Sequence, residues 1–122
     1  MNNKKTKKFL DKIIDEVNQK GIEYNSLTDS LQELREMVVK EDLPVLAKVI
    51  RLTYQHLEMF EDFYIPIPED EPLDDGEEKE NIKGKESILY LLNLIKQHNN
   101  KFNQEELREY IQYLEVFAED DE

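Results

Sequence analysis

The chain has 122 residues, no cysteine and a formal net charge of −13. This length fits a single domain with one core, and a chain without cysteine forms neither disulfides nor thiolate metal sites. No apolar run approaches the roughly 20 residues that span a membrane, and the negative charge disfavours nucleic acid as a partner because phosphates repel it. We therefore expect a cytoplasmic protein without a membrane association.

Residues 5–20 and 27–40 are predicted to form the first two helices, because their apolar residues recur at helical spacings. Gly21 is suited to end the first helix, since glycine readily adopts the left-handed conformation found there. Ser26 is the expected N-cap of the second, with Asp29 three residues later. The apolar stripes are Phe9, Leu10, Ile13, Ile14 and Val17, and Leu27, Leu31, Leu34 and Val38.

Residues 43–63 and 85–99 are predicted to form helices that are apolar over most of their circumference. Asp42 and Pro44 mark the start of the first of these, since proline loses no hydrogen bond at the first helical position. A helix with two apolar stripes is usually surrounded by others, so we expect residues 43–63 at the centre of the bundle. The second of its stripes is Val45, Val49, Leu52, Met59 and Phe63. The expected core centres on Leu46, Ile50, Leu57, Leu92, Ile95 and Leu114.

Residues 64–83 separate these two helices and carry no helical pattern. The prolines between Tyr64 and Pro68 favour an extended segment, which we expect to lie across the bundle with Ile65 and Ile67 pointing onto it. From Glu69 to Glu80 the chain holds eight acidic residues. This composition predicts a flexible acidic loop over 69–83. The spacing around Gly76 does not match an EF-hand, because Leu73 and Ile82 fall at ligand positions.

A fifth helix is predicted to begin after Asn103. Asn103 is the expected N-cap, Glu106 completes a capping box, and Phe102 is expected to pack against Leu107 as a hydrophobic staple. No segment alternates apolar and polar residues as a strand does. The sequence therefore predicts an all-α, single-domain bundle of about five helices over residues 1–122, in which 1–4 and 119–122 are frayed tails.

The residues that could carry chemistry match no catalytic or cofactor-binding pattern. Neither His56 nor His98 belongs to the Glu-x-x-His motif of di-iron bundles; we expect a structural role for His56 and a position in the last turn of the fourth helix for His98. The chain's three glycines are scattered, so no phosphate-binding loop is present. We therefore expect no enzyme activity, no cofactor and no metal site.

Tyrosines and acidic residues are the candidate partner-binding groups, because tyrosine is enriched at protein interfaces and clustered carboxylates steer basic partners. The candidates are Tyr90, Tyr110, Tyr113, Asp70, Asp74, Asp75, Glu77 and Glu78. The leading interpretation is a non-enzymatic interaction module that binds a protein partner or itself. The alternative is an acidic inhibitor or immunity-type protein that covers a basic active site, and a third possibility is an enzyme whose site has no recognised motif.

Overall fold

The structure is a computed structural model, which describes residues 3–68 and 84–120, with side chains as far as Ala118. It contains five helices: α1 (Lys4–Lys20), α2 (Tyr24–Lys40), α3 (Pro44–Phe60), α4 (Gly84–Lys96) and α5 (Lys101–Asp120). No strand occurs among the described residues, so the predicted all-α bundle of five helices is confirmed. The predicted acidic loop over 69–83 lies outside the described residues.

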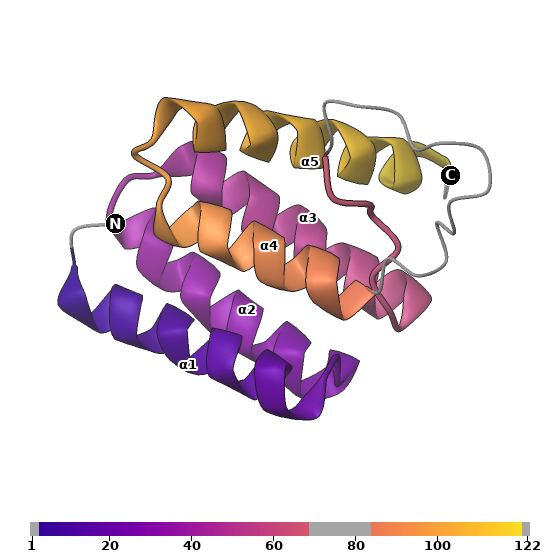
Figure 1. Cartoon of the computed structure of the whole chain (residues 1–122), viewed down its shortest axis with the longest axis horizontal. Coiled ribbons are helices and arrows are strands. Elements are labelled where there is room, and N and C mark those ends of the chain that lie inside the picture. Colours follow the sequence, from indigo (N-terminus) through magenta and orange to yellow (C-terminus); the bar gives the residue numbers. More distant parts are fainter. Residues whose placement is uncertain (1–2, 69–83, 121–122) are drawn as a thin grey trace.

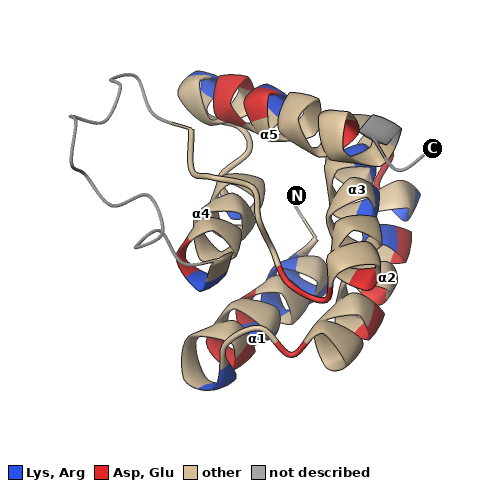
Figure 2. Cartoon of the chain, turned by 90° about the vertical axis from the view of Figure 1, so that its right-hand side faces the viewer, with Lys and Arg blue, Asp and Glu red and all other residues tan. Residues whose placement is uncertain are grey.

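The five helices form a ring in which each packs mainly against two others. The order around the ring is α1, α2, α3, α5, α4 and back to α1, and Figure 2 looks along it from one end. Consecutive helices run antiparallel, while α3 and α5 run in the same direction (Figure 1). The prediction that residues 43–63 form the centre is therefore wrong. One side of α3 faces outward instead, where Val45 is 54% and Met59 37% exposed.

The interior of the ring is the predicted core. All six residues named from the sequence are buried, at 3% exposure or less, because the inward stripes of all five helices converge there. Complete burial of one such aliphatic side chain stabilises the fold by about 1.5–3 kcal/mol. The six are Leu46, Ile50, Leu57, Leu92, Ile95 and Leu114.

The segment 61–68, called the strap below, crosses one end of the ring (Figure 2). Ile65 is buried as predicted, whereas Ile67 is only partly buried. The Ser87 hydroxyl on α4 donates a hydrogen bond to the Ile65 carbonyl at 2.5 Å. The start of α4 also approaches the strap closely, because a Cβ atom on Gly84 would lie 2.5 Å from the Phe63 carbonyl oxygen. These contacts fix the strap against α4.

Two seams join α4 and α5 to the first three helices, and each carries an exposed ion pair. Lys96 of α4 lies 2.7 Å from Asp11 of α1. Lys48 of α3 lies 2.9 Å from Glu115 of α5. Exposed pairs of this kind contribute at most about 1 kcal/mol each, so apolar packing holds the seams together.

The structure corrects the predicted start of α2. The helix begins at Tyr24, so Ser26 lies inside it, and the Ser26 hydroxyl bonds the Glu23 carbonyl instead of capping. Its end is bounded by Asp42, which takes a left-handed φ of 61° in the turn to α3. By contrast, α1 ends before Gly21 as predicted, and the Gly21 N–H bonds the Val17 carbonyl. Gly21 has a positive φ of 76°, but its ψ of −159° is not that of the predicted left-handed helical conformation.

The start of α5 also differs from the prediction. Asn100 is the cap: its Oδ1 accepts hydrogen bonds from the N–H groups of Phe102 and Asn103, at 2.8 and 3.3 Å. Asn103 instead donates from its side chain to the Gln97 carbonyl at 2.9 Å. Phe102 is 76% exposed, so it makes no staple with the buried Leu107. The helix therefore begins about one turn earlier than predicted, and the Phe102 side chain remains in solvent.

No helix in the described part of the chain has the length and apolar character needed to cross a membrane.

Candidate binding site at the end of the bundle

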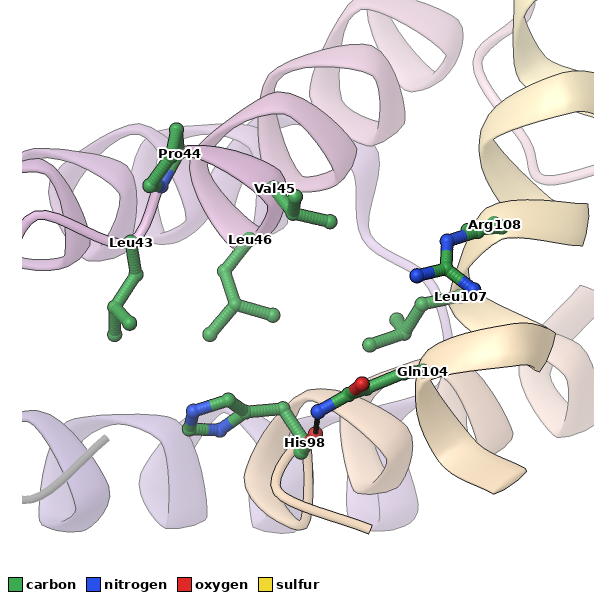
Figure 3. A pocket seen from close by; sticks show the side chains of 8 residues that line it. All are labelled: Leu43, Pro44, Val45, Leu46, His98, Gln104, Leu107 and Arg108. Carbon is green, nitrogen blue, oxygen red and sulfur yellow. Dashed lines mark hydrogen bonds between the residues drawn. The ribbon is translucent and has the colours of Figure 1, made fainter. Parts of the chain in front are cut away.

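A hollow of about 280 Å³, called the end pocket below, opens at the end of the ring where α3 and α5 begin and α4 ends (Figure 3). It lies opposite the end that the strap crosses. Four of the lining residues come from the start of α3 and three from α5, with one from the turn after α4. They are Leu43, Pro44, Val45, Leu46, His98, Gln104, Leu107 and Arg108.

The interior of the end pocket is apolar. Leu46 and Leu107 are buried, at 3% and 1% exposure, and belong to the core. Leu43 and Leu46 point from α3 toward His98 (Figure 3). Val45 is 54% exposed at the mouth of the pocket. Exposed apolar patches often mark interaction sites. A partner's side chain that fills a hollow beside such a patch loses its contact with water, as the strongest contacts of protein interfaces do.

Polar groups border the end pocket on the side of α4 and α5. The Gln104 side chain donates to the His98 carbonyl at 3.0 Å and so holds the turn between these helices. His98 lies in that turn, since α4 ends at Lys96, and not in the last turn of the helix as predicted. Burial is the main cause that lowers the pKa of His98, so its imidazole is neutral at about pH 7. The guanidinium group of Arg108 points back toward the hollow (Figure 3).

The three candidate tyrosines lie elsewhere. Tyr110 is fully buried, and its hydroxyl donates to the Ser87 carbonyl at 3.0 Å. Burial raises its pKa above the usual range, and its ring forms part of the core. Tyr110 is therefore not available to a partner, and that prediction is wrong. Tyr90 is partly buried and donates to Glu106 at 2.6 Å, while Tyr113 is 41% exposed on α5.

The acidic candidates Asp70, Asp74, Asp75, Glu77 and Glu78 lie outside the described residues. Among the described residues, no group of three His, Asp or Glu side chains is arranged to hold a metal ion.

His56 is buried at the strap end, with 3% of its surface exposed. Its Nε2 accepts a hydrogen bond from the Tyr64 N–H at 3.1 Å, so the neutral ring carries its proton on Nδ1. Phe60 and Phe117 contact the ring, with centroids at 4.7 and 5.1 Å. Burial lowers the pKa of His56 to about 4, although the Asp62 carboxylate partly opposes the effect. The imidazole therefore joins α3 to the strap as a neutral acceptor.

Comparisons of the chain with protein-family models, with curated proteins and with solved structures found no match. The function is therefore argued from the geometry of the chain itself.

Sequence reasoning did not find the end pocket. From the sequence, Val45 belongs to an apolar stripe that is expected to face other helices, and Arg108 belongs to no recognised pattern. The pocket is assembled from three separate segments, and the exposed side of α3 that forms its mouth is set by the ring arrangement. The available signal was the motif Leu43-Pro44-Val45-Leu46, which puts apolar residues at consecutive positions of a first helical turn, where a single buried face cannot accommodate all of them.

Proposed function

We propose that this chain is a non-enzymatic, cytoplasmic interaction module that binds a protein partner by accepting an apolar side chain in the end pocket. The observation that carries the proposal is an apolar hollow of about 280 Å³ with the exposed Val45 at its mouth. Small-molecule sites usually occupy ~300–1,000 Å³. A hollow near the lower end of that range has room for a single anchoring side chain.

The state of three reactive groups outside the end pocket supports a role without catalysis. Ser87 and Tyr110 bond each other and the backbone inside the core. His56 has its Nε2 occupied by a backbone N–H. A general base needs a free nitrogen or oxygen within reach of a substrate. The hydroxyls of Ser87 and Tyr110 and the Nε2 of His56 are already hydrogen-bonded within the fold.

Val45 and Val116 provide a matched test. Both are valines on helices, at 54% and 55% exposure, so replacement of either by Glu should change the free energy of unfolding by no more than about 0.5 kcal/mol. Val45 lines the end pocket, and Val116 does not. A charge at the mouth of the pocket should therefore block an apolar anchor, while the same charge on α5 leaves binding intact.

The experiment is cross-linked affinity purification from the cells that make the chain, with wild type, Val45→Glu and Val116→Glu compared in parallel. We expect a partner that is recovered by wild type and Val116→Glu and lost by Val45→Glu. Circular dichroism of all three proteins checks that the helices are intact. Equal recovery by the two variants, or no partner recovered by wild type, contradicts the proposal.

A further variant addresses the alternative of an acidic inhibitor. Replacement of residues 70–80 by a Gly/Ser linker removes the acidic candidates and leaves every residue of the end pocket unchanged. If this variant loses the partner while Val45→Glu retains it, the acidic segment is the binding surface, and the inhibitor interpretation replaces ours.

A further inference from the structure

All three arginines of the chain line one corner of the molecule. Arg108 borders the end pocket, and Arg35 and Arg51 line a second hollow of about 460 Å³ between α2 and α3. The two hollows share Leu43 and Pro44 as a common wall. The second hollow is lined by Arg35, Val39, Asp42, Leu43, Pro44, Ala47, Lys48 and Arg51.

The charge of this corner is opposite to that of the whole chain. Its lining residues include three arginines, Lys48, which is paired with Glu115, and the acid Asp42, whereas the chain carries a net charge of −13. At physiological salt, charges beyond about 8 Å are largely screened. A bound group therefore responds mainly to this local cationic surface.

The arginines have unused hydrogen-bonding capacity. The Nε–H of Arg35 is buried and has no acceptor among the described residues. Arg51 makes one long bond, from Nη1 to Gln55 at 3.4 Å, while Lys48 is already paired with Glu115. Guanidinium groups bind carboxylates in a two-point geometry that lysine does not match.

The apolar residues between the arginines select the class of ligand. Val39 and Val45 are 49% and 54% exposed beside the shared wall of Leu43 and Pro44. A nucleic acid backbone offers phosphates but no aliphatic group for such a surface. A peptide offers carboxylates and aliphatic side chains together.

We propose that the partner presents an acidic peptide segment, whose carboxylates bind Arg35, Arg51 and Arg108 while an adjacent apolar side chain enters the end pocket. This inference rests on the proposed function, because it assumes that the end pocket is the docking site. It adds the chemical class of the partner. In this inference the end pocket takes the apolar anchor, with Arg108 at its border, and the second hollow takes carboxylates at Arg35 and Arg51.

The test is selection of a random peptide library, displayed on phage, against the immobilised full chain. We expect enriched peptides to carry Asp or Glu next to an apolar residue. Binding of a synthetic copy of the best peptide, measured by fluorescence anisotropy, should weaken about tenfold in an Arg35→Gln/Arg51→Gln double variant, which corresponds to roughly 1.4 kcal/mol. A Lys8→Gln/Lys12→Gln double variant removes the same charge from exposed positions of α1 and should bind as wild type does.

Five other outcomes overturn the inference. Enriched peptides that are neutral or basic, but lose binding in Val45→Glu, remove the acidic class and leave the proposed function standing. Enriched peptides that bind Val45→Glu normally, or no enrichment at all, contradict the proposed function as well. Displacement of the peptide by single-stranded RNA of mixed sequence identifies a nucleic-acid surface. A dimer that competes with the peptide, detected by sedimentation, makes a second copy of the chain the occupant.

Discussion

Replacement of His56 by Gln should flatten the acid side of the stability profile. The imidazole is buried and neutral, with a pKa lowered from 6.5 to about 4. Between these values the unfolded chain binds a proton at this position and the folded chain does not, so stability falls as the pH falls from about 6.5 toward about 4. One pKa unit corresponds to 1.36 kcal/mol, which gives a loss of about 2 kcal/mol at about pH 5 and about 3 kcal/mol below pH 4. Gln keeps an acceptor for the Tyr64 N–H and does not titrate.

The assay is urea denaturation of wild type and His56→Gln at about pH 7 and about pH 5. Both proteins keep the same carboxylates, whose contributions cancel in the difference, so wild type should lose about 2 kcal/mol more than the variant. NMR titration of the two histidine rings gives an independent measurement, with the His56 proton expected on Nδ1 at neutral pH. Equal loss in both proteins, or a His56 pKa near 6.5, would refute the reasoning.

Two further predictions concern the core and a helix cap. Ile50→Ala should lower the free energy of unfolding by about 2–5 kcal/mol, because Ile50 is fully buried; a loss below about 1 kcal/mol by chemical denaturation would mean that this face of α3 is not in the core. Asn100→Ala should cost about 0.5–2 kcal/mol, because two N–H groups at the start of α5 lose their acceptor. Asn99→Ala is the control, since Asn99 is exposed in the same turn, and an equal effect of both substitutions on the denaturation midpoint would rule out Asn100 as the cap.

The helices and the core were predictable because they depend on short-range periodicity. Ile50 and Leu92 lie at the centre of regular apolar stripes, and the structure buries both. Helix starts were less predictable, because alternative caps compete. Asn100 and Asn103 are both suited to cap α5, and the local sequence favours Asn103, which is followed by Glu106. In the structure Asn103 bonds Gln97 instead, so the tight turn after α4 determines which of the two caps the helix.

The candidate site was not predictable, because it depends on how the helices are arranged in space. Arg35, Arg51 and Arg108 belong to three helices, and they share a corner because α3 packs between α2 and α5 in the ring. The tyrosines show a second limit of prediction from sequence, which concerns neighbouring residues on a single helix. Tyr110 and Tyr113 are three residues apart on one helix, yet one is fully buried and the other 41% exposed. Composition identified both as interface residues, and only the direction of each side chain separates them.

The two seams of the ring divide the chain into complementary halves. Residues 4–68 supply α1, α2, α3 and the strap, and residues 84–120 supply α4 and α5. The halves meet noncovalently, through α1 with α4, α3 with α5, and the strap with Ser87. The peptide link between the halves therefore favours folding, because it raises the effective concentration of each half near the other. Expressed as separate chains, the halves would assemble as a heterodimer, and its thermal midpoint would rise with protein concentration as expected for a folding reaction coupled to association.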